Sequence, residues 1–379
     1  MTRWPDRKQE SISPPSSRIP LYPAPSSVPM STTLLIPLLR LPTLFIRSVL
    51  SYFDIDDLIK LASLSKKSCE LVKPMKVELK VNVYGEDRHL EIQMNSRNTE
   101  TWKFKQGKPN TTEITTRIER KDKKDMFIDK WILSKTKSAD LYPTMAETIR
   151  CLTEVLTCLV FEVNIKTNSL SKESKIEDLR VGECSNLMII GEKCMENSEL
   201  AQILENISAT ELLSISVPTN SEFKCNPNHF KCKILKIDRK GGWVTPQLLF
   251  EMKCSRIVIR DSHFDLKDCI SFVWRWKLCD LKKHEKFECL EIQFKDAVRN
   301  PVIPEGLGAQ KWNKKTRNQF YLRLGDPVYL NCQNGLDIIQ EDKETLATIL
   351  IHNDGHDFFF GVWPKRLTTT GGIGGSSRP

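Results

Sequence analysis

The sequence predicts an α+β fold in which a short three-helix segment precedes a β-meander and an array of alternating strands and helices. Three observations support this prediction. A leucine-dense stretch over residues 34–74 has the apolar spacing of helices, the residues after it alternate between apolar and polar, and short apolar strands then recur with helical segments between them. The chain has 379 residues, of which 40% are hydrophobic, so it is long enough for two or three domains with real cores.

The two ends of the chain have the composition of flexible segments. Residues 1–33 are rich in Pro and Ser, so a continuous helix is blocked and too few apolar side chains remain for a core. Residues 365–379 are rich in Thr, Gly and Ser. We therefore expect a disordered head and a flexible tail on either side of the folded region.

Charge, cysteine content and hydropathy indicate which classes of partner and which cellular compartment to expect. The net charge of +9 is modest, and the 57 basic residues are interspersed with 48 acidic ones and with few aromatic side chains, which argues against nucleic-acid binding. The twelve cysteines are irregularly spaced. The longest apolar run near the start, Leu34–Leu39, is too short for a signal-peptide core or a bilayer span. We expect an intracellular protein, cytoplasmic or nuclear, with reduced thiols and no membrane partner.

The leucine-dense stretch predicts three short helices. Pro42 suits the first turn of the first helix, and Asp54 is placed to cap the second. Ser65 begins a third helix that ends before Pro74. The first helix has one apolar face with the i, i+3, i+4, i+7 spacing, formed by Ile46, Val49, Leu50 and Phe53. Three helices in about 40 residues cannot bury their apolar faces by themselves, so part of this surface should contact a partner.

From Lys76 onward the apolar period changes to two, which predicts an antiparallel meander. The first two strands are expected over residues 77–83 and 90–94, and Trp102 and Phe104 follow them. Because successive side chains of a strand point to opposite faces, one face of this meander should be buried.

The meander belongs to a predicted β-rich linker domain over residues 75–165. The polar residues 106–124 are expected to form a loop, and Asp125–Leu133 a short element. A helix follows Pro143, and a strand is expected over residues 158–165. The buried face of that helix is formed by Met145, Ile149, Leu152 and Leu156.

Short apolar strands then recur with helical segments between them. They are expected at Leu187–Ile190, Leu212–Val217, Ile234–Ile237, Ile257–Ile259 and Leu290–Phe294. One strand and one helix in about 20–29 residues is the leucine-rich-repeat period. Residues 180–364 therefore predict a degenerate leucine-rich-repeat-like strand–helix array with its strands along one face. Two closing hairpins are expected from strands over residues 336–340, 345–351 and 357–363.

The leucine-dense stretch resembles an F-box, in the variant found in a large nematode family. The residues that carry the resemblance are Leu41, Pro42, Val49, Leu50, Phe53, Asp57, Leu58, Leu61, Leu64, Ser65 and Lys66. Ser68 and Cys69 stand where many F-boxes have a Trp. In F-box proteins this motif docks on the Skp adaptor of a cullin–RING ubiquitin ligase. The resemblance implies adaptor contacts at Leu41, Pro42, Ile46, Val49, Leu50, Leu58, Ile59 and Leu61.

The C-terminal region resembles the F-box-associated type 2 domain of the same nematode proteins. The segments that carry this second resemblance are CKILKID, CSRIVIRDSHF, Trp274-Arg275-Trp276, CLEIQF, GLDII and the final pattern of Phe358, Phe360, Val362 and Trp363. Two departures occur near GLDII. Gln340 stands where the family usually has Arg, and residues 341–343 replace an Asp-Gly turn.

Together the resemblances imply a substrate-recognition subunit of an SCF-type cullin–RING E3 ubiquitin ligase. The F-box, over residues 34–74, would bind a Skp-type adaptor and through it a cullin, and the C-terminal domain would hold a protein substrate. Catalysis would belong to partner subunits, so no catalytic residue, metal or cofactor is expected. The alternative is a leucine-rich-repeat-like protein-binding module whose helical segment only caps the array, without a ligase partner.

Motifs for other chemistry are sparse. Two Cys residues and a His, with a third Cys downstream, could be assembled into a zinc site, but their spacing matches no standard zinc motif. They are Cys225, His229, Cys232 and Cys254. Cys279 and Cys289 could carry ubiquitin as a thioester, which the F-box interpretation does not need. The sequence contains no GxGxxG, P-loop, GxSxG or HExxH motif, so no motif supports an enzyme.

Two further pairs of residues have competing interpretations. Trp274 and Trp276 lie on different faces if their segment is helical, so one should be in the core and one exposed, or both should border a groove. Two core rings are the alternative. His352 and His356 flank a hairpin turn, where solvated side chains are expected and a metal or catalytic pair is the alternative.

Overall fold

The computed structural model describes residues 41–84, 87–94, 98–106, 112–121, 127–136, 141–166, 179, 181–279, 287–322, 329–342 and 344–364. The chain divides into two units, Met1–Leu41 and Pro42–Pro379, and every element named below belongs to the second. The expected disordered head and flexible tail, together with residues 34–40 of the leucine-dense stretch, lie outside the described residues.

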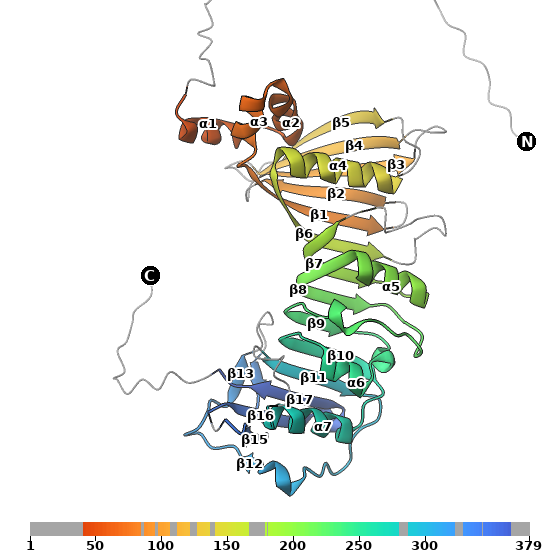
Figure 1. The fold of residues 1–379 in the computed structure, drawn as a ribbon, viewed down its shortest axis with the longest axis vertical. Coiled ribbons are helices and arrows are strands. Elements are labelled where there is room, and N and C mark those ends of the chain that lie inside the picture. Colours follow the sequence, from red (N-terminus) through yellow and green to blue (C-terminus); the bar gives the residue numbers. More distant parts are fainter. Residues whose placement is uncertain are drawn as a thin grey trace, which may run out of the picture. The chain divides into compact units, whose positions relative to one another are not determined.

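Three short helices open the second unit, as the leucine-dense stretch predicts (Figure 1). They are α1 (Thr43–Leu50), α2 (Ile55–Leu64) and α3 (Lys66–Val72). Pro42 is the N-cap residue of α1. The Ser65 hydroxyl accepts a 3.1 Å hydrogen bond from the Ser68 N–H at the start of α3. Asp54 is the N-cap residue of α2, as predicted, but its side chain makes no capping hydrogen bond.

One sheet of fifteen strands runs through the described part of the chain. Its order is β12-β15-β16-β17-β11-β10-β9-β8-β7-β6-β1-β2-β3-β4-β5. The strands of this sheet are β1 (Lys76–Tyr84), β2 (Asp87–Met94), β3 (Asn98–Gln106), β4 (Thr112–Lys121), β5 (Phe127–Thr136), β6 (Thr157–Lys166), β7 (Gly182–Ile190), β8 (Ile207–Ser216), β9 (Ile234–Ile237), β10 (Arg256–Ser262), β11 (Cys289–Phe294), β12 (Gln310–Lys311), β15 (Leu336–Ile339), β16 (Leu346–His352) and β17 (Asp357–Val362). A separate two-stranded sheet consists of β13 (Phe320–Leu322) and β14 (Tyr329–Asn331).

The first five strands form an antiparallel meander, as the alternating pattern predicts. Leu79 lies opposite Ile92 across β1 and β2. The prediction of a loop over residues 106–124 is wrong, because residues 112–121 form β4 between β3 and β5. Thr and Ile, which favour strands, recur in this segment, and its many charged residues hid that preference.

β6 to β11 run parallel and lie next to one another in sequence order. Parallel crossovers are right-handed, which puts the connecting helices on one face of the sheet. The helices α4 (Leu141–Val155), α5 (Asn197–Asn206), α6 (Pro246–Glu251) and α7 (Leu266–Lys277) lie along that face (Figure 1). Apolar side chains at every second strand position meet these helices, and Val163, Leu187 and Leu235 are fully buried there. β1 pairs with both β2 and β6, so the meander and this parallel region share one sheet.

Two hairpins close the sheet, as predicted. β17 returns antiparallel to β11, and β16 and β15 add beside it. Successive side chains of β17 point to opposite faces. Phe360 packs on Trp276 of α7 and Phe359 on Tyr321 of β13, each with 5.1 Å between ring centroids. The β13–β14 sheet therefore covers the face opposite to α7.

Phe360 is the centre of an aromatic cluster beneath α7. Its side chain is fully buried, and its ring lies 6.3 Å from Phe272 and 6.1 Å from Phe287, in addition to the contact with Trp276. Aromatic rings in such edge-to-face and stacked arrangements stabilise a core beyond the area that they bury.

A carboxylate of the meander caps α2. Glu100 on β3 is 3% exposed and accepts a 2.7 Å hydrogen bond from the N–H of Ile55, the first residue of α2, and a 3.2 Å one from Nε1 of Trp102. A carboxylate at a helix N-terminus satisfies a backbone N–H that has no partner within the helix. Burial raises the pKa of the Glu100 carboxyl above its ordinary 4.5, although these hydrogen bonds oppose the rise. This contact ties the three-helix segment to the sheet.

Replacing Phe360 by Ala tests the aromatic cluster. We expect Phe360→Ala to lower the free energy of unfolding by about 3–5 kcal/mol, because a cavity remains where the ring was. Phe320→Ala serves as the control, since Phe320 is 51% exposed and its truncation should cost less than about 0.5 kcal/mol. Urea denaturation followed by tryptophan fluorescence measures both values. Equal losses in the two variants would contradict the packing described here.

The Glu100 contact predicts a pH dependence. The folded-state pKa of Glu100 lies above the unfolded value, so its contribution to stability is complete below pH 4.5 and is lost as the pH rises through the folded pKa. The difference in free energy of unfolding between wild type and Glu100→Gln should therefore fall as the pH rises from 4.5, and then level off.

Glu91 provides a control of opposite sign. The hydrogen bond with His89 holds the pKa of Glu91 below 4.5. Its contribution is complete above pH 4.5 and is lost as the pH falls through the folded pKa. The difference in free energy of unfolding between wild type and Glu91→Gln should therefore fall as the pH falls below 4.5. Parallel pH profiles for the two variants would contradict both assignments.

Candidate functional site

Helix α1 has two apolar faces. Ile46 and Leu50 form the inner face and are 2% and 0% exposed. Phe45, Val49 and Tyr52 follow the i, i+4, i+7 spacing on another side of the helix and are 66%, 39% and 70% exposed. Although Tyr52 follows the last residue of α1, its N–H donates to the Val49 carbonyl at 3.1 Å, so the turn continues. We refer to Phe45, Val49 and Tyr52 as the outer stripe of α1.

Two exposed leucines add to the apolar surface of this segment. Leu44 on α1 is 79% exposed, and Leu64 at the end of α2 is 75% exposed. Single exposed apolar residues are ordinary, but several on two adjacent short helices are typical of a contact surface. The outer stripe of α1, together with Leu44 and Leu64, thus leaves large apolar side chains exposed on this segment.

The structure divides the eight residues predicted to contact an adaptor. Three are buried, two are exposed and three are half-buried. The buried ones are Ile46, Leu50 and Leu58; the exposed ones are Pro42 and Val49; the half-buried ones are Leu41, Ile59 and Leu61. Leu41 ends the separate unit Met1–Leu41, so it is not part of the face described above. Direct adaptor contact by each of the eight residues stays a prediction.

The sequence-based prediction missed Phe45 and Tyr52. A signal for them was present, because their spacing with Val49 is as regular as that of Ile46 with Leu50. α1 carries more apolar residues than one buried face can hold. The pattern alone does not tell which of two apolar faces packs inward, since that depends on how α3 lies against α1.

The four candidate zinc ligands do not gather into one cluster. Among the described residues, no group of three or more His, Cys, Asp and Glu side chains is placed to hold a metal ion. Cys232 and Cys254 are buried neighbours with 3.6 Å between their sulfur atoms. They precede β9 and β10 at equivalent positions of two paired strands. Burial raises the pKa of the Cys225 thiol to about 12.

The other candidates are placed as follows. Cys289 is 2% exposed, which leaves its sulfur inaccessible to a ubiquitin thioester, and Cys279 is half-buried. Trp276 is in the core, whereas Trp274 is half-buried, with the Lys277 ammonium 5.2 Å from its ring. The segment is helical, and Trp276 is in the core as predicted, but Trp274 is half-buried rather than exposed. In the part of the chain that the structure describes, no helix has both the length and the apolar character to cross a bilayer.

Comparison with known proteins matches residues 38–80 to the F-box domain. Two uncharacterized Caenorhabditis elegans proteins are also similar to this chain. F59B2.9 is 22% identical over 192 residues, which cover 48% of this chain but only 42% of that protein. F59B2.8 is 21% identical over 356 residues, or 87% of this chain and 78% of that protein. No solved structure matches the chain at a significant level. Residues 38–80, which include α1, α2 and α3, are an F-box domain, and such domains generally bind Skp-type adaptors in ubiquitin ligases.

Proposed function

We propose that this chain is the substrate-recognition subunit of an SCF-type cullin–RING E3 ubiquitin ligase. The F-box binds a Skp-type adaptor, and through it a cullin, while the region after the F-box holds a protein substrate. The observation that carries the proposal is the exposed outer stripe of α1 within the matched F-box. The chain itself is not a catalyst in this proposal; it brings substrate lysines close to the ubiquitin-charged enzyme and so raises their effective concentration.

The adaptor contact is centred on the outer stripe of α1. Phe45 and Tyr52 are rigid aromatic side chains, which lose little conformational entropy when they are buried at an interface. Pro42 and Leu44 extend the apolar surface at the start of the helix. Burial of this surface supplies about 25 cal/mol per Å² of apolar area removed from water, before the cost of association.

The buried predicted residues support this face from inside. Ile46, Leu50 and Leu58 pack in the interior and fix the angle at which α1 presents its outer stripe. Ser68, which stands where many F-boxes have a Trp, is buried, and its hydroxyl lies 2.8 Å from that of Ser65. The F-box of this chain thus uses a small polar pair at the start of α3, and its adaptor contact rests on α1.

The C-terminal region serves as the substrate-binding part. The proposal assigns it to the F-box-associated type 2 family and interprets the parallel strands β6 to β11 as a degenerate leucine-rich-repeat-like array. Their sequence-order pairing supports this interpretation. In the alternative proposal the same array binds proteins without a ligase partner. The two proposals differ in one respect only, the retention of an adaptor by the F-box.

Substitution of Phe45 by Asp tests the adaptor contact. A charge at this 66% exposed position should weaken binding to a purified Skp-type adaptor at least tenfold. Loss of an aromatic side chain at an interface hot spot costs about 2 kcal/mol of binding free energy, and removing the new carboxylate from water is unfavourable as well. Biolayer interferometry with the immobilised full chain measures this affinity.

Val302→Asp is the matched control. Val302 is 79% exposed and lies outside the F-box, so the new charge should leave adaptor affinity within about twofold of wild type. Leu50→Asp is unsuitable for this test, because Leu50 is fully buried and a charge there would unfold the segment. A wild-type chain that retains no adaptor would overturn the ligase proposal and leave the alternative.

A further inference from the structure

Within the described part of the chain, β14 has an unpaired edge. Its hydrogen-bonded neighbour is β13, with Phe320 opposite Asn331. The N–H of Cys332 donates to the Gln319 carbonyl at 2.8 Å. In an antiparallel pair, residues that bond to the partner strand alternate with residues that do not, so this bond shows which residues of β14 bond to β13. The backbone N–H and C=O groups of Asn331 and Tyr329 therefore point away from β13. No described residue bonds to them.

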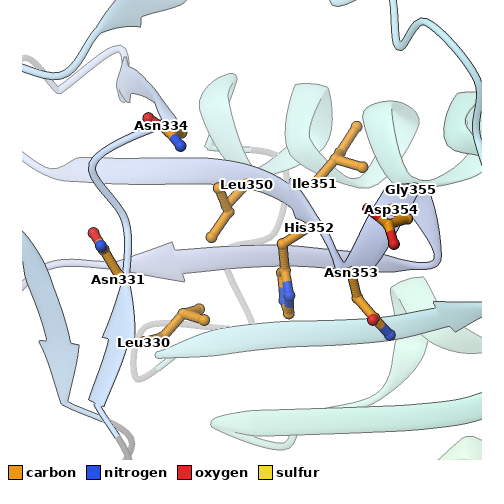
Figure 2. Close-up of a pocket in the computed structure, with 9 residues that line it drawn as sticks. All are labelled: Leu330, Asn331, Asn334, Leu350, Ile351, His352, Asn353, Asp354 and Gly355. Carbon is orange, nitrogen blue, oxygen red and sulfur yellow. The ribbon is translucent and has the colours of Figure 1, made fainter.

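A pocket of about 530 Å³ lies along this edge. Figure 2 shows Leu330 and Asn331 on one side of it and His352 and Asn353 on the other. Leu350 points into the space between them from β16 and belongs to the same apolar cluster as Phe359 and Tyr321, against which Leu330 packs. The pocket thus has an apolar floor and a rim of amide and imidazole groups.

A rigid turn closes the far end of the pocket. Asn353, Asp354 and Gly355 are three successive residues in the left-handed region, with φ of 52°, 53° and 90°. Nδ2 of Asn353 donates to the Asp357 carboxylate at 3.1 Å, which holds the turn on β17. A Cβ atom at Gly355 would lie 2.5 Å from the Val298 carbonyl oxygen, so only glycine fits there. The wall opposite β14 is therefore fixed.

We propose that the β14 edge and this pocket bind an extended peptide segment of a partner protein by strand addition. A strand edge presents alternating donors and acceptors in one line, and another polypeptide backbone is the ligand that matches this arrangement. Under the proposed function, this partner is the substrate, but binding of the peptide does not depend on the adaptor.

The geometry specifies the order of side chains in the bound segment. Residues that are opposite each other in paired strands point to the same face of the sheet. Leu330 faces inward, so the peptide residue opposite Leu330 places its side chain on Leu350, at the floor of the pocket. The two residues next to it face outward, beside Tyr329, which is 62% exposed. The binding motif is therefore one apolar residue between two residues whose type is not restricted.

A displayed library of random twelve-residue peptides is the probe. Panning on the full chain should enrich sequences with one conserved apolar position. In fluorescence polarisation, Asn331→Pro should lower the affinity for an enriched peptide about tenfold. The proline ring removes the backbone N–H that faces the pocket, and with it a hydrogen bond to the peptide that is worth about 1 kcal/mol. N-methylation of the peptide should weaken binding by a similar factor at alternate residues only.

Two variants control for fold and side chain. Asn331→Ala removes the side-chain amide from the pocket rim but keeps the backbone N–H, so Asn331→Pro should bind the peptide about tenfold more weakly than Asn331→Ala. Phe320→Pro makes the same backbone change at the opposite position, on the edge of β13 that faces away from the pocket, and should retain binding. Panning without enrichment, equal affinities for wild type and Asn331→Pro, or N-methylation effects without alternation would each overturn the proposal.

The test separates this inference from the ligase proposal. Phe45→Asp should lose the adaptor and keep the peptide, while Asn331→Pro should lose the peptide and keep the adaptor. If wild type retains no adaptor but binds peptides with the alternating pattern, the ligase proposal fails and strand addition stands.

Discussion

The hydrogen bond between the Glu100 carboxylate and the Ile55 N–H is the interaction on which the arrangement of the F-box depends. Three helices of seven to ten residues cannot form a stable core by themselves, so they have to pack on one another and on the rest of the chain. A buried carboxylate that caps α2 from β3 fixes where this packing occurs. Thr157 adds a second tie, since its hydroxyl donates to the Lys73 carbonyl at 2.7 Å. With one side of α1 held inward, its other apolar side remains exposed.

The same sheet extends from the F-box contact to the C-terminal hairpins through an unbroken series of paired strands. Its two faces have different roles at the C-terminal end. Helix α7 covers one face at Phe360, and the β13–β14 sheet covers the other at Phe359. A buried ion pair holds the smaller sheet in place. Nε of Arg317 donates to the Asp337 carboxylate at 2.7 Å, and the same oxygen accepts from the Thr348 hydroxyl at 2.8 Å. The pocket beside β14 thus rests on a rigid base.

The local spacing of apolar residues was enough to predict most helices and strands. The predictions failed where contacts between residues far apart in the sequence determine the structure. Alternating apolar residues such as Leu79, and helical spacing such as Met145 with Ile149, correctly indicated strands and helices. Residues 112–121 form a strand because β3 and β5 lie on either side of them, which their polar sequence did not indicate. Asp54 was correctly placed before α2, but the capping group is Glu100, far away in sequence.

For the candidate site, sequence spacing found α1 but not its exposed face. Burial of Ile46 and exposure of Phe45 depend on how α3 lies against α1, which no local rule contains. The edge of β14 was equally hidden, since three residues are too few for a strand pattern. The order in which strands pair has a consequence for synthesis on the ribosome. β7 to β11 each add to the strand made just before, whereas β1 must wait for β6, about 80 residues later, before its second edge is covered. The F-box and meander thus leave the ribosome with the second edge of β1 open, and β6 is the segment that covers it.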